Sequence, residues 1–535
     1  MTFKGMMTRQ IVRIGVFGII LGLILFAAPS DAFVSQDFAA RDTLRIRGFE
    51  TSFQPKFDPA RGETVFVTQQ IFDGLVRLDS DLKIVPDLAE YWDISEGGMC
   101  YTFYLRKGVR FHNGRTFSAA DVKFSFLRLL RGESGSSFGR PFLDRVVGAE
   151  DYALGKAADV EGFRILDPYI FEIKWRKPYV SALILLSMSF CRILPQDPAE
   201  KEGDDFFFHP IGTGPFKFDS WIRSPRLDIV GVRLIRNPSY FGRAPRIGAV
   251  EYSPFFTNDN FAERLVDVMP FSEDLAGFGC QVVEGGDLNV SYLMMSCANP
   301  PLDRDRVRRA LALIIDRDKI VQAVPSESVR YRASHDFIPA RLPGFFPSFN
   351  PENADPAQAV RILEEEGYFR TKEFPEIRLY TPFTERLAQA PFIRELTRQF
   401  EAVNISLKAK TFHNLDELKD EHRPFFLLWK RSMDFPDPEN MIQPLFGRDS
   451  AFGWLTAGFP GSDFLGLLDA AGLEAGRAKR LDLFREMEQI LRRDVPGVPL
   501  FTSEQRLAIQ PNVRGLRMHP LGAMYLDLRE VTFSR

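Results

Sequence analysis

Residues 72–130, FDGLVRLDSDLKIVPDLAEYWDISEGGMCYTFYLRKGVRFHNGRTFSAADVKFSFLRLL, contain strand and helix patterns in close succession. Residues 76–85 predict a hairpin, and residues 101–106 alternate apolar and polar side chains like a half-buried strand. Ser118 and Asp121 form a capping-box pattern ahead of a helix. The apolar stripe of that helix carries Val122, Phe126, Leu129 and Leu130. Strand and helix patterns keep alternating along the chain, which predicts an α/β fold.

Three further helices are expected downstream. Asp303 can cap one of them, and Asp355 followed by proline predicts the start of a second. A third, around Leu481, must end before Pro496 because proline cannot continue a helix.

The composition is that of a large folded protein. The chain has 535 residues, more than one hydrophobic core fills, and 45% of them are hydrophobic. The formal net charge of −3 argues against a protein that binds nucleic acid through a basic surface. Phenylalanine, with 51 copies, dominates the aromatic residues. This excess must fill several cores and could also line an apolar cleft.

The N-terminus has the pattern of a secretory signal peptide. Basic residues precede an uncharged apolar run at residues 14–28, and Ser30 and Ala32 suit the small positions of a cleavage site. We therefore expect residues 1–32 to be removed. The alternative is an uncleaved membrane anchor, because the run approaches the ~17–25 residues of a spanning helix.

Export would place four cysteines in an oxidising compartment, where they could pair in three ways. They are Cys100, Cys191, Cys280 and Cys297. Cys280 and Cys297 are the closest pair in sequence, and free buried thiols are the alternative.

The sequence offers no assembled catalytic or metal site. Residues 135–139, GSSFG, match the pattern of a nucleophile elbow, but that elbow follows a strand, and here a helix pattern precedes it. The six histidines never lie at the short spacing of a metal-ligand pair. We therefore expect a protein that is not an enzyme, with no catalytic residue, no bound metal and no cofactor.

Several ordered motifs resemble one family. The quoted stretch contains P-x-L-A-E-x-W at 86–92, T-F-x-L-R-x-G-V-x-F-x-x-G at 102–114 and A-x-D-V at 119–122. GTGPF follows at 212–216, RNPSYF at 236–241, PPLD at 300–303 and DVP at 494–496. Together they resemble the bacterial extracellular solute-binding proteins of family 5, the dipeptide-, oligopeptide- and nickel-binding components of ATP-driven importers.

The resemblance implies an α/β periplasmic-binding-protein fold of type II, with two lobes around a ligand cleft and an additional inserted domain. Lobe one would take residues 33–70, 186–270 and 501–535. The inserted domain would take residues 71–185, and lobe two residues 271–500.

Residues 429–446, WKRSMDFPDPENMIQPLF, resemble the family segment W-x-x-D-[YF]-x-[DE]-P. In peptide binders its first aspartate pairs with the α-ammonium group of the ligand, and here that residue is Asp434. A turn-capping role for Asp434 is the alternative. Arg431 stands where the family has tryptophan, and Trp429 lies two residues earlier. Arg431 could bind a ligand carboxylate or offset the charge of Asp434.

The ligand-binding candidates carried over from the resemblance also include Phe435, Glu63 and Thr64. The implied function is an exported, periplasmic protein that captures peptides, or a similar small polar solute, by hinge closure. Its partners would be a membrane permease and its ATPase. We expect a monomer that binds no nucleic acid and meets the membrane only through the permease, or through an uncleaved anchor.

Two alternatives remain on the same fold. One is a membrane-tethered sensor or chaperone-like binding module. The other is binding of a metal chelate such as nickel or haem, although the scarcity of histidine weakens the nickel version.

Overall fold

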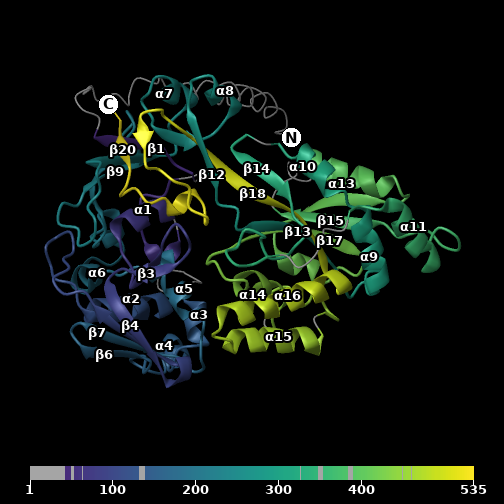
Figure 1. Ribbon diagram of the computed structural model, residues 1–535, viewed down its shortest axis with the longest axis horizontal. Helices are drawn as coiled ribbons and strands as arrows, with labels where there is room; N and C mark the ends of the chain where they lie inside the picture. Colours follow the sequence, from purple (N-terminus) through teal and green to yellow (C-terminus); the bar gives the residue numbers. More distant parts are fainter. Residues whose placement is uncertain are drawn as a thin grey trace, which may run out of the picture.

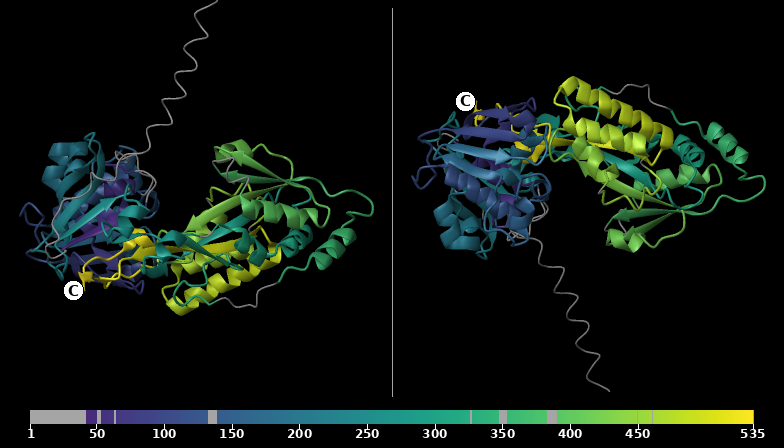
Figure 2. Two further views of the ribbon diagram at one scale, coloured as in Figure 1. Left: turned by 90° about the horizontal axis from the view of Figure 1, so that it is seen from above. Right: turned by 90° about the horizontal axis from the view of Figure 1, so that it is seen from below.

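The chain folds into two lobes that lie side by side (Figure 1). The computed structural model describes residues 42–49, 53–62, 64–131, 139–325, 327–346, 353–382, 390–448, 450–459 and 461–534. Purple to teal segments and the C-terminal strands build the first lobe, whereas green and yellow segments build the second. The views from above and below show the same two bodies (Figure 2). The expected signal peptide, Glu63 and residues 135–138 lie outside the described residues.

A mixed sheet of 12 strands runs through both lobes. Its order is β16-β15-β17-β13-β18-β11-β1-β10-β9-β8, with β12 and β14 also paired to β18. The first lobe contributes β1 (Thr43–Arg47), β8 (Phe216–Arg223), β9 (Ile229–Arg236), β10 (Ala249–Ser253) and β11 (Val268–Pro270). The second lobe contributes β13 (Asn289–Met295), β15 (Ile377–Pro382), β16 (Leu407–Phe412) and β17 (Phe425–Ser432).

The long strand β18 (Gly497–Ile509) belongs to both lobes. Its first residues pair with β13 of the second lobe, and its last three pair with β11 of the first. Two further strands, β12 (Gln281–Gly285) and β14 (Val329–Ala333), pair antiparallel with the same strand. Side chains alternate between the two faces of a strand. The pairing register of β18 with its neighbours therefore fixes which of its residues face the core of each lobe.

The expected hairpin and the helix behind it are confirmed. Strands β2 (Val76–Leu78) and β3 (Ile84–Pro86) pair antiparallel. Helix α2 (Ala119–Arg131) begins where the capping-box pattern predicts, with the Asp121 carboxylate accepting from the Ser118 amide over 2.9 Å. This helix packs on an antiparallel sheet of β4 (Ala89–Ser95), β5 (Cys100–Leu105), β7 (Ile170–Lys174) and β6 (Phe163–Asp167). The Phe126 ring lies 5.5 Å from that of Phe163, so aromatic packing joins the helix to the sheet.

Most of the other helices are short. Those of the first lobe and its upper edge are α1 (Val65–Ile71), α3 (Arg140–Leu143), α4 (Ala149–Ala153), α5 (Ala182–Leu186), α6 (Gln196–Glu202), α7 (Asn258–Ala262) and α8 (Glu273–Ala276). The second lobe has α9 (Asp305–Ile314), α10 (Arg317–Ala323), α11 (Pro356–Glu365), α13 (Pro391–Glu401), α14 (Glu439–Phe446), α15 (Ser462–Leu473) and α16 (Arg477–Asp494). Single 3₁₀ turns are η2 (Pro59–Arg61), η3 (Glu96–Gly98), η4 (Ser189–Cys191), η6 (Leu415–Leu418) and η7 (Ala523–Tyr525), with a longer one at η5 (Gly203–Phe208). A final pair of strands is β19 (Val513–Arg514) and β20 (Thr532–Phe533).

The helix boundaries confirm two of the three downstream predictions. The Asp355 carboxylate caps α11 by accepting from the Gln358 amide over 2.8 Å, and α16 ends before Pro496. The prediction that Asp303 caps a helix is wrong, because α9 begins at Asp305 with Arg304 before it. The Leu302 and Arg304 amides donate to carbonyls three residues back, so a turn occupies this stretch and delays the helix.

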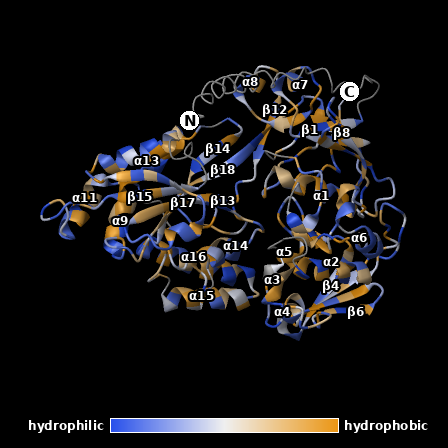
Figure 3. Cartoon of the chain, turned by 180° about the vertical axis from the view of Figure 1, so that it is seen from behind, coloured by the Kyte–Doolittle hydropathy of each residue, from blue (hydrophilic) through white to orange (hydrophobic). Residues whose placement is uncertain are grey.

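Phenylalanines fill cores in both lobes, for example Phe103 in the first and Phe426 and Phe484 in the second. Nine of the twelve largest fully buried side chains are phenylalanines. Orange, apolar residues mark β15, β17 and α9 in Figure 3, with blue residues in the surrounding loops. Within the part of the chain that the structure describes, no helix combines the length and apolar character needed to cross a bilayer.

Candidate functional site

The candidate site begins where β17 ends. This strand lies between β13 and β15, and the chain then turns through Asp434 into α14. Asn440 of α14 organises the turn: its side-chain oxygen accepts from the Asp434 amide at 2.8 Å, and its side-chain nitrogen donates to Asp434 Oδ2 at 3.3 Å. Arg431 donates to the Asn440 carbonyl over 2.6 Å. The sequence-predicted pair, Arg431 and Asp434, is therefore brought together by a residue that the motif did not single out.

Asp434 keeps one oxygen available. Its Oδ2 lies 3.5 Å from Arg431 Nη2, whereas Oδ1 has no partner among the described residues. The side chain is 56% exposed. Burial lowers the pKa of Arg431, and the charge of Asp434 acts against that shift. Arg431 thus partly offsets the negative charge of Asp434, yet the carboxylate can still accept a hydrogen bond from a cationic group that arrives from solvent.

Tyr525 of η7, in the first lobe, lies close enough for the charge of this carboxylate to act on it. Burial, followed by the charge of Asp434, raises the pKa of Tyr525 to about 12. The 3₁₀ turn η7 packs against α1. Thr64 precedes α1 with φ 46° and ψ 47°, a left-handed conformation that is strained for threonine, and its side chain is buried. Such strain is common where backbone geometry serves binding.

The remaining sequence-predicted residues have other surroundings. The Trp429 ring makes an edge contact with Phe452 at 5.1 Å and packs on a second-lobe core. Phe435, although it follows a second-lobe strand, packs against the core around the four-stranded sheet of the first lobe. Phe435 therefore contributes an apolar contact between the lobes.

A cavity of about 900 Å³ lies next to Tyr525. Its walls come from α1, the β2–β3 hairpin, residues 240–243 and the C-terminal segment 515–530. Sequence reasoning missed these residues, because they come from segments up to about 450 positions apart in the chain. This volume is in the range of small-molecule sites.

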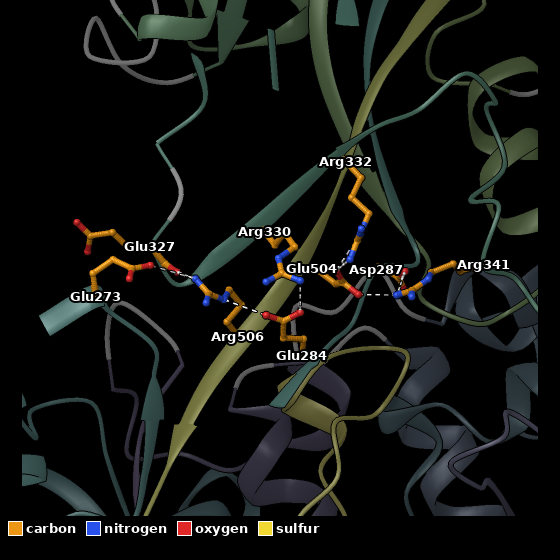
Figure 4. Close-up of polar contacts among 9 residues, drawn as sticks. All are labelled: Glu273, Glu284, Asp287, Glu327, Arg330, Arg332, Arg341, Glu504 and Arg506. Carbon is orange, nitrogen blue, oxygen red and sulfur yellow. Dashed lines mark hydrogen bonds and ion pairs between the residues drawn. The ribbon is translucent and has the colours of Figure 1, made fainter. Parts of the chain in front are cut away.

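Charged side chains surround β18 where it passes between the lobes (Figure 4). Arg506 reaches Glu284 at 3.1 Å, and Arg330 reaches the same carboxylate at 2.7 Å. Further along the strand, Glu504 lies 3.0 Å from Arg332 and 2.5 Å from Arg341. Only 5% of the Glu504 side chain is exposed, so this carboxylate depends on its two guanidinium partners. These ion pairs connect β12, β14 and β18 at the junction of the lobes.

The four cysteines are free thiols, so the structure favours that alternative over any of the three pairings. Across the described ranges, no group of three or more histidine, cysteine or acidic side chains is arranged to hold a metal ion.

Sequence comparison establishes the family. The sequence model of the bacterial extracellular solute-binding proteins, family 5, matches residues 83–453. The chain belongs to this family, whose members are substrate-binding proteins. The predicted family, the two-lobed fold and the class of function are therefore confirmed.

Known relatives cover nearly the whole chain. Di/tripeptide-binding protein 1 of Pseudomonas aeruginosa is 25% identical over 97% of this chain and 98% of its own length. Heme-binding protein A of Haemophilus influenzae is 27% identical over 85% and 86%, respectively. The solved structure of HbpA2 from Haemophilus parasuis matches 92% of this chain and 100% of its own, with a TM-score of 0.77 and 22% identity.

Proposed function

We propose that this protein is the exported, periplasmic binding component of an ABC importer and that it captures peptides with a free N-terminus. The observation that carries the proposal is the exposed Asp434 carboxylate, held by Asn440, whose charge acts on Tyr525 of the other lobe. A peptide ammonium at Oδ1 would form a charge-assisted hydrogen bond that is independent of the peptide's side chains. The relatives named as peptide-binding proteins support this assignment.

In this proposal the ligand is held between the lobes, and closure delivers it to the permease and its ATPase. The division into residues 33–70, 71–185, 186–270, 271–500 and 501–535 would define the moving parts. β18 and its flanking ion pairs would bend as the lobes approach. Ligand contacts that form only in the closed state would favour that state. The entrance to the ligand site beside Asp434 would be lined by Thr64, Phe435 and Arg431. Glu63 stands next to Thr64 in the sequence, just before helix α1.

A second candidate ligand is haem, because one relative covering most of the chain is named as a heme-binding protein. In that case the apolar contacts of Phe435 and Trp429 would matter more than the Asp434 carboxylate. We propose a monomer that meets the membrane through the permease.

Mass spectrometry of ligand released by unfolding the purified protein tests the function. We expect short peptides, and a rise in melting temperature when a di- and tripeptide panel is added back. A haem absorption spectrum with no response to peptides would favour the second candidate. A consistently empty protein that responds to neither would contradict the assignment. The intact mass of the exported chain separates cleavage after Ala32 from a retained anchor.

A further inference from the structure

The cavity beside Tyr525 has an unusual lining. Six arginines line it, and they come from strand β2, from the positions directly after β5 and η4, from the loop between β9 and β10, and from the C-terminal segment. They are Arg77, Arg106, Arg192, Arg243, Arg517 and Arg529. Five carboxylates share the lining, so the availability of each cation depends on its pairing.

Most of the carboxylates are already occupied. Asp527 lies 2.5 Å from Arg529, and Glu530 lies 2.6 Å from Arg243. The Asp73 carboxylate accepts from the Thr213 hydroxyl at 2.8 Å and is buried in the floor. Burial, followed by the charge of Asp87, raises the pKa of Asp73 to about 7.

Two of the guanidinium groups make no direct contact with a carboxylate, although the charge of Arg77 acts on Asp87 and Asp527. Within the described part of the chain, Arg77 on β2 and Arg517 on the rim make no hydrogen bond or ion pair. Arg192 in the floor has only a 3.8 Å approach to Asp87 and a 3.4 Å hydrogen bond to Gln69. The lining therefore holds one more guanidinium group than it has carboxylates, and two of its cations are not engaged by a hydrogen bond or ion pair.

The floor also lacks a hydrogen-bond acceptor. Arg192 is 8% exposed and Gln69 is half-buried, yet Arg192 Nε and Gln69 Nε2 have no acceptor among the described residues. Buried polar groups are nearly always paired, and an unpaired one indicates a missing water, ion or ligand. Both unpaired groups are donors, so the missing partner is an acceptor.

We propose that this cavity is an anion subsite, which receives a carboxylate or phosphate carried by a ligand whose ammonium group pairs with Asp434. The inference rests on the proposed function and deepens it, because it narrows the ligands to peptides with additional negative charge. Tyr525 lines the cavity and lies within reach of the charge of Asp434, and Phe435 beside Asp434 and Phe241 of the lining pack on the same core, so one ligand could extend from Asp434 to the cavity.

The test compares ligands that differ only in charge. Calorimetric titration of the unfolded and refolded, ligand-free protein would use Ala-Glu-Glu, its neutral isostere Ala-Gln-Gln and inorganic phosphate. We expect Ala-Glu-Glu to bind about tenfold more tightly than Ala-Gln-Gln, as for a charge-assisted contact. The variant Arg77→Gln would remove most of that preference. If it folds poorly, Arg517→Gln is used in its place, with the same expected result. Arg110→Gln, an exposed arginine outside the cavity, is the matched control and would keep it.

Inorganic phosphate separates the subsite from the proposed function, because it can enter the cavity without using Asp434. Phosphate binding that is lost in Arg77→Gln and kept in Asp434→Asn supports the subsite, even if no peptide binds. Failure of all peptides would then contradict only the peptide assignment. The subsite is overturned if phosphate does not bind and the two peptides either bind with equal affinity or do not bind at all.

Discussion

The Arg480 guanidinium donates to the Ser181 hydroxyl over 3.2 Å and so joins residues 299 positions apart. Arg480 lies on α16 in the second lobe, whereas Ser181 precedes α5 in the first. The same nitrogen lies 2.8 Å from Asp437 and 2.9 Å from Glu439. The lobes are therefore in polar contact at a place separate from β18.

Replacing Arg480 with methionine should destabilise the protein by about 3–5 kcal/mol, because it leaves the Asp437 carboxylate buried without a cation and Glu439 with only the 3.4 Å contact to Arg145. Only 4% of the Arg480 side chain is exposed. Urea unfolding measures the change. Arg448→Met is the matched control, since its 2.8 Å pair with Asp469 is exposed on both sides, and it should cost less than about 1 kcal/mol. Equal effects of the two variants would contradict the role of Arg480.

Asp434→Asn should weaken the binding of free peptides by about 1.5–3 kcal/mol, the value of a hydrogen bond to a charged group. N-acetylated peptides lack the ammonium group and should bind wild type and variant alike. Calorimetry with both forms of one tripeptide makes the comparison, and Asp420→Asn, at an exposed turn position after η6, serves as control. Equal losses for the free and acetylated peptides would remove Asp434 from this role.

Stability should depend on pH through Glu488 of α16. Burial, followed by the charge of Asp336, raises the pKa of Glu488 to about 8. At a pH between the usual glutamate pKa and about 8, Glu488 is therefore protonated in the native state and ionised in the unfolded chain. This contribution is complete at low pH and is lost as the pH rises through about 8, with a slope of at most about 1.4 kcal/mol per pH unit.

Urea unfolding at pH 5, 6, 7 and 8 checks the prediction. Glu488→Gln should flatten the profile, because glutamine cannot titrate. Glu486→Gln makes the same change at an exposed position of the same helix and should leave the profile unchanged. The idea fails if wild type and Glu488→Gln show the same slope.

Thiol reactivity should distinguish Cys280 from the other cysteines. Cys100, Cys191 and Cys297 are buried, and burial raises the pKa of the Cys297 thiol to about 11, whereas Cys280 is partly exposed. Since the thiolate is the reactive form, a native titration with a disulfide reagent should modify one thiol quickly. Unfolding the protein without a reductant should make all four thiols reactive. Two or fewer reactive thiols under those conditions would mean that disulfides form in the protein.

Local features were predictable from sequence. The hairpin at β2–β3, the start of α2 and the cap at Asp355 follow from turn, capping and proline patterns that act within a few residues. Asp303 was misjudged because the turn that displaces the helix depends on carbonyls earlier in the same loop. For the candidate site, the motif located Arg431 and Asp434 but not Asn440, which fixes both.

The sequence by itself determined the family, the α/β character and the position of the acidic turn after β17. A periodic pattern states which face of an element is buried, but it does not name the partner of that face. Only the tertiary structure decided that Arg480 meets Ser181, that β18 serves both lobes, and that the hairpin and the C-terminal segment enclose one arginine-lined cavity. Each of these depends on contacts between distant segments, and those form only when the whole chain has packed.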